Sequence, residues 1–212
     1  MKRSRIPLVI TACVLVSNVN NVRLLDFKVN NGHIMCSATG GTTMTNIQAK
    51  GIYVVGTTSA HSAAVNIYCD SSSTINGLMF GNVVSKGSHT DGFRFGGSGS
   101  GTIKNLEMRF CRSENSGLTT PRVDTSVGYR FGAGVSMQSA KIIGCDAAYS
   151  WCSGFYFTAG ASMTSITLSG CSSNYNGQKG DAANGMGYQL NGQAGVQLVN
   201  CDGIGNKGAL IA

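Results

Sequence analysis

Charge, proline and long apolar runs are all scarce in this sequence. Of its 212 residues only 12% are charged and 2 are proline, whereas 30 are glycine. Apolar residues make up 42%, which is too many for a disordered chain, and the glycines follow no three-residue period, which excludes collagen. No apolar stretch reaches the roughly 18 residues that a membrane-spanning helix needs, so we expect no membrane span. No amphipathic stretch with helix caps stands out either.

Short runs of β-branched and aromatic residues, bounded by Gly, Asn and Ser, fill the chain instead. Such runs are typical of strands separated by turns. The length is that of one domain with enough chain to bury a core. The sequence therefore predicts a single all-β domain over residues 1–212.

A six-residue pattern, apolar-x-apolar-x-x-apolar, organises most of the chain. Its seven copies begin at Val22, Ile47, Leu78, Leu106, Ala140, Ile166 and Val196, with spacings of 25 to 34 residues. After each copy come a polar turn and a second strand of the form apolar-x-apolar. These second strands begin at Ile34, Val65, Phe93, Tyr129, Phe155, Tyr188 and Ala209.

A repeat of this kind has one stable arrangement, because a single coil cannot cover its own apolar face. Stacked coils of short parallel strands form a right-handed parallel β-helix, here of about seven coils. The pattern shows no capping helix at either end. Bare coil ends favour association, so we expect a segment of a longer protein or a homo-oligomer, for which a trimer is one option.

The first sixteen residues have two interpretations. The sequence "MKRSR" followed by "IPLVITACVLV" has the charged start and apolar run of a secretory signal, and "ITAC" is similar to a lipoprotein cleavage box. The same residues also fit a first partial coil of the repeat. Both interpretations stay open at this point.

Stacking the copies turns equivalent positions into columns. The last position of the pattern is occupied by Phe27, Ile52, Val83, Cys111, Cys145, Cys171 and Cys201. No C-x-x-C pair is present, and stacked parallel thiols cannot form a tetrahedron, so we expect packed thiols and no metal, with their oxidation state open. The following turn carries polar residues that we expect to satisfy backbone groups: Asn30, Ser116, Ser150, Asn176 and Asn206.

The net charge of +7 and the isoelectric point near 9.1 favour an anionic partner. Apart from "KRSR" the basic residues are dispersed, and no nucleic-acid-binding motif accompanies them. We therefore expect an acidic polysaccharide rather than nucleic acid.

Strands such as "ITLSGC…N…GYQL", over about residues 20–212, resemble the repeats of the pectate-lyase-like superfamily of right-handed parallel β-helices. That superfamily includes polysaccharide lyases, polygalacturonases and bacteriophage tailspikes. The stretch "HTDGFRF" resembles the "NTDG" strand entry of polygalacturonases, which would make Asp91 a catalytic carboxylate. The "GDD", "GHG" and "RIK" motifs have no counterparts, so tailspike and depolymerase domains are the closer resemblance. It implies an extracellular or virion location and the recognition and depolymerisation of a surface polysaccharide.

The long turns between first and second strands emerge along one edge and carry most of the titratable groups. Glycoside hydrolysis needs two carboxylates, which Asp91 could supply with Glu114 or Asp124. Elimination needs a base, for which His89 is the candidate, together with arginines that neutralise a uronate. The alternative is that these are solvated loop charges and turn residues. No cofactor is expected, although a lyase could recruit Ca²⁺ through loop carboxylates.

The outward column of the second strands would suit a glycan chain, since guanidinium groups bind acids and aromatic rings stack on sugars. Its candidate binding residues are Arg94, Arg130, Tyr156 and Gln189, with Trp151 in a turn on the same edge. Three hypotheses follow: a polysaccharide hydrolase or lyase, a non-catalytic glycan-binding domain, or the structural shaft of a fibre or adhesin. Whether the chain is an enzyme is left open.

Overall fold

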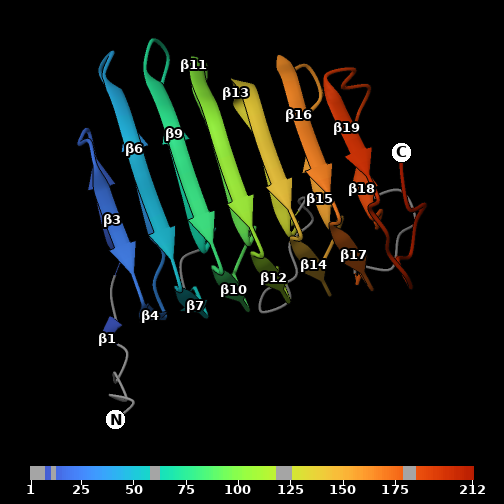
Figure 1. Cartoon of the computed structure of the whole chain (residues 1–212). Helices are drawn as coiled ribbons and strands as arrows, with labels where there is room; N and C mark the ends of the chain where they lie inside the picture. The colour runs from blue at the N-terminus through green and yellow to red at the C-terminus, as the bar shows by residue number, and fades with distance from the viewer. Residues whose placement is uncertain (1–7, 11–12, 58–62, 118–125, 179–184) are drawn as a thin grey trace.

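The computed structural model describes residues 8–10, 13–57, 63–117, 126–178 and 185–212. Regular structure in these residues is entirely β, and the strand pairs are parallel. The strands lie side by side in successive coils along one axis (Figure 1). The prediction of an all-β, right-handed parallel β-helix is confirmed.

Three faces make up each coil. We call them the long face, the short face and the third face. The long face consists of β3 (Val22–Leu25), β6 (Thr43–Lys50), β9 (Thr74–Gly81), β11 (Phe93–Arg109), β13 (Tyr129–Ile143), β16 (Met163–Ser169) and β19 (Val196–Val199). The short face consists of β1 (Leu8–Ile10), β4 (Phe27–Asn30), β7 (Tyr53–Val55), β10 (Val84–Lys86), β12 (Arg112–Glu114), β14 (Asp146–Ala148) and β17 (Ser172–Asn174).

The third face consists of β2 (Val14–Ser17), β5 (Ile34–Ala38), β8 (Val65–Cys69), the first parts of β11 and β13, β15 (Phe155–Phe157) and β18 (Tyr188–Gln189). The strands β11 and β13 continue from this face into the long face, which joins the two faces into one sheet. In Figure 1 the long face lies in front.

The register follows the sequence pattern. All seven first positions of the repeat align, from Val22 paired with Ile47 to Ile166 paired with Val196. In the last coil, however, Tyr188 pairs with Ile211 and not with Ala209, so that predicted second strand is wrong by two residues. The backbone bonds agree with this register, since the N–H of Gly187 donates to the carbonyl of Ala209 and the N–H of Tyr188 to that of Leu210.

The N-terminal segment contributes two short strands. Leu8 pairs with Phe27, and Val14 pairs with Ile34. These pairs extend the short face and the third face by one strand each. Residues 1–7 and 11–12 of this segment lie outside the described residues.

Left-handed backbone marks the corners of the coils. The corner after the long face is formed by Asp26, Gly51, Asn82, Phe110, Gly144, Gly170 and Asn200, all with φ between 50° and 65°. The corner after the short face is formed by Asn31, Gly56, Gly87, Asn115, Tyr149, Tyr175 and Gly205, all with φ between 52° and 66°. Gly, Asn and Asp adopt this conformation most readily, which explains why these residues are abundant in the chain.

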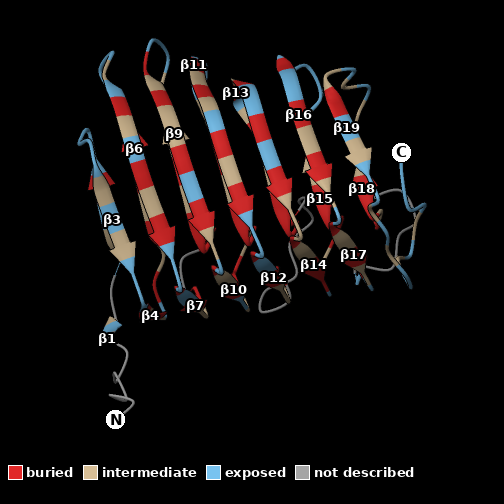
Figure 2. Ribbon diagram, viewed as in Figure 1, coloured by how far each residue is buried: buried red, intermediate tan, exposed pale blue. Residues whose placement is uncertain are grey.

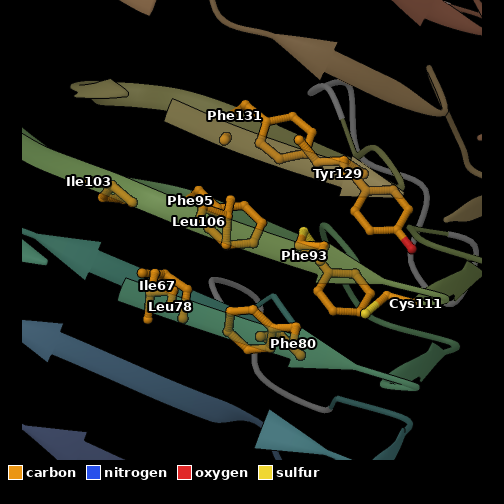
Figure 3. Packing of buried hydrophobic residues seen from close by; sticks show 14 of the residues in the cluster. Ile67, Leu78, Phe80, Phe93, Phe95, Ile103, Leu106, Cys111, Tyr129 and Phe131 are labelled. Carbon is orange, nitrogen blue, oxygen red and sulfur yellow. The ribbon is translucent and has the colours of Figure 1, made fainter. Parts of the chain in front are cut away.

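The interior consists of stacked columns, visible as buried bands across the strands in Figure 2. One column of rings runs Phe93, Tyr129, Phe155 and Tyr188, with successive centroids 4.7, 4.7 and 5.0 Å apart. A second runs Phe95, Phe131 and Phe157 at 5.3 and 4.9 Å. Figure 3 shows the two columns packed against aliphatic side chains of the long face, such as Leu78 and Leu106.

A buried polar column follows the second corner. Ser116, Ser150 and Asn176 are buried there, and Asn176 Oδ1 accepts the backbone N–H of Ser150 at 2.9 Å. The N–H of Asn176 donates in turn to Asn206 Oδ1 at 3.0 Å. The predicted polar ladder is present for these residues. Asn30 does not belong to it, because it ends strand β4 with its side chain on the outer side of the short face.

Candidate functional site

Asp91 is a buried structural anion. Its side chain is 2% exposed and accepts hydrogen bonds from Arg130 Nε at 2.7 Å and Arg130 Nη2 at 3.0 Å. The backbone N–H of Val127 donates to the same carboxylate at 3.1 Å. Burial opposes the charge on Arg130, but the charge and hydrogen bonds of Asp91 outweigh it and raise the pKa of the guanidinium. These bonds therefore tie β13 and the turn before it to the turn before β11.

Glu114 does not converge on Asp91. It belongs to β12 in the short face, where its carboxylate pairs with Lys86 Nζ at 3.6 Å and with Arg112. Arg112 also pairs with Asp146 at 3.1 Å. Two carboxylates facing one another across a cleft, as hydrolysis requires, are not formed by Asp91 and Glu114. Asp124, the other candidate partner, lies outside the described residues.

His89 is buried in the turn before β11. It is 8% exposed, and its backbone N–H donates to Thr57 Oγ1 at 2.7 Å. His89 therefore lies inside the turn, and not on an exposed loop edge as the sequence had suggested. Among the described residues, no three His, Cys, Asp or Glu side chains converge on a point that could hold a metal ion.

The predicted outward column of the third face is present. Arg94 pairs in register with Asn66 on one side and Arg130 on the other, and Arg130 pairs with Tyr156. The guanidinium carbon of Arg130 lies 5.1 Å from the centroid of the Tyr156 ring. Arg94 has no acidic partner among the residues that the structure describes.

The remaining two predicted binding residues are engaged within the turns. Gln189 Oε1 accepts a hydrogen bond from Ser153 Oγ at 2.8 Å, and the backbone N–H of Trp151 donates to the carbonyl of Ser116 at 2.8 Å. The Trp151 side chain is partly buried. The column is real, but its Arg, Tyr and Gln side chains mostly bind one another and nearby turns.

A different surface, the outer side of the long face, carries most of the basic side chains that form no ion pair with a described residue. The sequence-based prediction of sites missed this surface. The strands of the long face present five basic residues outward, Arg23, Lys50, Lys104, Arg109 and Lys141, against one acidic residue, Glu107. Only Arg109 forms an ion pair with a described residue, which is Glu107. The long face therefore holds four of the protein's seven net positive charges.

An apolar notch interrupts this cationic surface. Gly81 stands in register between Lys50 and Arg109, and without a side chain there a hollow of about 290 Å³ opens. Its rim includes Leu25, Met79 and Phe110. These three side chains are 51%, 46% and 62% exposed, which is unusual for large apolar groups lying together.

The sequence did contain a signal for this surface. Positions two and four of the six-residue pattern point outward in every copy, and they include Arg23, Lys50, Arg109 and Lys141. The buried positions of the same pattern define the fold, whereas these outward positions define its charge.

Comparisons with known proteins add little to the geometry. No protein-family model matches the chain, and no curated protein matches it. Among solved structures, QnrB1, a plasmid-mediated fluoroquinolone resistance protein, is similar over 91% of both chains at 15% identity, with a TM-score of 0.28. At that score the likeness carries no argument about what this chain does.

The expected assignment to pectate-lyase-like tailspikes is corrected: the solved structure found to be similar is QnrB1, not a polysaccharide-degrading β-helix. The expected recognition and depolymerisation of a polysaccharide is corrected with it. The physical reason for the error is plain in the site: "HTDGFRF" places Asp91 in a buried ion pair with Arg130. Stacking requirements alone produce the repeat, so the repeat identifies no activity.

No helix long and apolar enough to cross a membrane occurs in the part of the chain that the structure describes.

Proposed function

We propose that this β-helix is a non-catalytic binding protein whose long face recognises an acidic surface on a partner protein. The observation that carries the proposal is the concentration of charge: five basic side chains and one acidic side chain share one uncovered sheet face. Parallel strands fix the backbone of these residues in rows, so binding has to order their side chains but not their backbone.

A partner protein fits this surface better than a nucleic acid does. The basic residues alternate with exposed apolar side chains, Leu25, Met79 and Phe110, around the Gly81 notch. Protein interfaces combine Met, aromatic and Arg side chains at their centre with polar groups at the rim. A single-stranded nucleic-acid groove would stack successive bases on several aromatic rings, whereas Phe110 is the one exposed ring among the described residues that line the notch.

The test uses acidic peptides as probes, since the partner is unidentified. One fluorescent 20-residue peptide alternates glutamates with leucines, and a second replaces each leucine with serine. Replacing Arg23, Lys50 and Lys141 by Glu should weaken binding of both peptides about tenfold or more, because each exposed charge contact contributes about 0.2–1 kcal/mol. Replacing Met79 and Phe110 by Ser should weaken only the binding of the leucine peptide.

The matched control changes the same number of charges elsewhere. Lys28, Lys86 and Lys207 lie off the long face, and their replacement by Glu should change the dissociation constants by less than about threefold. Equal weakening by both triple variants would show attraction to net charge alone and would overturn the proposal. Tighter binding of a 30-base-pair DNA duplex than of either peptide would assign the face to nucleic acid instead.

A further inference from the structure

Gly81 is a strand glycine that neither its backbone nor its packing requires. Its backbone lies outside the left-handed region that favours glycine, and the nearest atom to a Cβ built there would be Lys50 Cγ, at an ordinary contact distance of 3.7 Å. The strand glycine Gly96 is different, because a Cβ there would lie 2.7 Å from the carbonyl oxygen of Ala133. A glycine inside a strand weakens the strand, and it often marks a place where another molecule approaches closely.

Two cations flank the notch at Gly81. Lys50 of β6 and Arg109 of β11 are in register with Gly81 of β9 on its two sides (Figure 1). Both side chains are exposed, that of Arg109 by 52%. Its ion pair with Glu107, two residues earlier on β11, orients the guanidinium along its own strand. Neighbouring strands lie about 4.8 Å apart, so a group placed at Gly81 would have a cation about one strand spacing away on each side.

The protein already uses this spacing for cation–π contacts. Lys28 and Tyr53 are in-register neighbours on β4 and β7, and Lys28 Nζ lies 5.8 Å from the centroid of the Tyr53 ring. Arg130 and Tyr156 are in-register neighbours on β13 and β15, where the guanidinium carbon lies 5.1 Å from the ring centroid. Both distances are within the roughly 6 Å over which a cation attracts the face of a ring. A ring seated at Gly81 would have such a neighbour on both faces.

The size and the rim of the notch also suit a ring. Its volume of about 290 Å³ is at the lower limit for pockets that hold small molecules, and it offers room for one large side chain. The exposed side chains of Met79 and Phe110 lie on its rim. Thioether sulfur and aromatic edges both make favourable contacts with aromatic rings.

We propose that the notch binds one aromatic side chain of the acidic partner, which lies between Lys50 and Arg109 while carboxylates on either side of it pair with the other basic residues of the long face. This inference rests on the proposed function, since it describes how the long face selects its partner. Aromatic side chains buried in pockets near the centre of an interface carry much of the binding energy, whereas exposed charges mainly give orientation and rate. The ligand class is a protein segment in which Asp or Glu residues border an aromatic residue.

The experiment compares three fluorescent, glutamate-rich peptides of about 20 residues by fluorescence anisotropy. They differ only in the central residue, which is phenylalanine, cyclohexylalanine or alanine. Cyclohexylalanine has nearly the size of phenylalanine but no π electrons. We expect the phenylalanine peptide to bind about tenfold more tightly than the alanine peptide and about threefold more tightly than the cyclohexylalanine peptide.

Two variants separate the space in the notch from the charge beside it. Gly81→Thr fills the notch with a residue that favours strands, so it should bring the three dissociation constants to within about twofold of one another and leave that of the alanine peptide unchanged. The double variant Lys50→Met, Arg109→Met keeps two long side chains without their charges. It should weaken all three peptides but abolish the difference between phenylalanine and cyclohexylalanine. Should Gly81→Thr fail to fold, Gly81→Ala adds a single carbon and should reduce the phenylalanine preference by about half.

The matched control is Ser169→Thr, which adds a methyl group in the same outward column, in register beyond Ile143. It should leave every ratio unchanged. Equal binding of the phenylalanine and alanine peptides to the parent, or a preference that survives in Gly81→Thr, would overturn the aromatic notch. Dimerisation of the parent that Gly81→Thr abolishes, measured by sedimentation, would assign the notch to a second copy of the chain and overturn it too.

Failure of this inference is distinct from failure of the proposed function. If the three peptides bind equally well and all are weakened by replacing Arg23, Lys50 and Lys141 with Glu, the long face still recognises an acidic partner and only the aromatic notch is wrong. If none of the three peptides binds the parent, both proposals are wrong.

Discussion

The first and last coils of the rod fill the same cross-section with different side chains. In sequence order, the first-corner column and the second-strand column of successive coils hold Phe27 and Ile34, Ile52 and Val65, Val83 and Phe93, Cys111 and Tyr129, Cys145 and Phe155, and Cys171 and Tyr188. Along the rod the first member changes from Phe, Ile and Val to Cys, and the second changes from Ile and Val to Phe and Tyr. Figure 3 shows Cys111 beside the ring of Phe93 in the neighbouring coil. Interiors are close-packed, so the combined volume of the two columns is what the fold constrains.

The difference also changes how successive coils hold together. In the later coils the rings of Phe93, Tyr129, Phe155 and Tyr188 stack within 10° of parallel. Stacked rings add about 0.5–1.5 kcal/mol per pair beyond the area that they bury. The small thiols opposite them are what make room for these rings, so the thiol column and the ring column depend on each other.

The outer side of the third face also differs between early and late coils. This difference gives the largest predicted effect on the free energy of unfolding. The early coils place uncharged Met35 and Asn66 where later coils place Arg94 and Arg130. Replacing Asp91 by Ala leaves Arg130 charged with its side chain 13% exposed and should cost about 3 kcal/mol in the free energy of unfolding. Urea denaturation measures this value.

Two further variants test the cause of that loss. Adding Arg130→Asn, which copies the residue of the early coil, should recover most of the stability because no unpaired charge remains. Glu114→Ala removes a carboxylate whose partners Lys86 and Arg112 are half-exposed, and should cost less than about 1 kcal/mol. Similar losses for Asp91→Ala and Glu114→Ala would contradict the assignment of Asp91 as a buried structural anion.

The sequence predicted the fold because the fold depends on a local pattern. Six-residue copies such as those starting at Leu78 and Leu106 bury alternate residues, and their pairing follows directly. The ion pair of Asp91 with Arg130 could not be predicted, since it joins residues 39 positions apart on neighbouring coils through the exact geometry of a turn. The cationic long face was predictable only in part. Its basic residues are dispersed in the sequence, and the strand register is needed to show that they lie on one face.

Exchanging residues between the early and late versions of the first-corner and second-strand columns tests whether the two columns share a fixed interior volume. Phe155→Val, which copies Val65 of the second coil, should cost about 2 kcal/mol because it leaves a cavity in the buried interior. Adding Cys145→Ile, which copies Ile52, should fill that cavity and restore stability to within about 1 kcal/mol of the parent. Cys145→Ile alone should also destabilise, by overpacking against Phe155. Denaturant unfolding of the four proteins forms a double-mutant cycle, and additive effects would show that the columns do not share volume.

The smallest predicted effect concerns the corner after the long face, where two neighbouring later coils differ. Gly144 and Gly170 have nearly the same left-handed backbone, with φ of 58° and 59°. A Cβ on Gly170 would meet nothing within 4 Å, whereas a Cβ on Gly144 would lie 2.8 Å from the Phe110 ring. Gly170→Ala should therefore cost about 1 kcal/mol for the backbone alone. Gly144→Ala should cost about 1 kcal/mol more by displacing the ring, and Phe110→Asn should remove that excess, whereas equal costs for the two glycines would show that the ring moves aside freely.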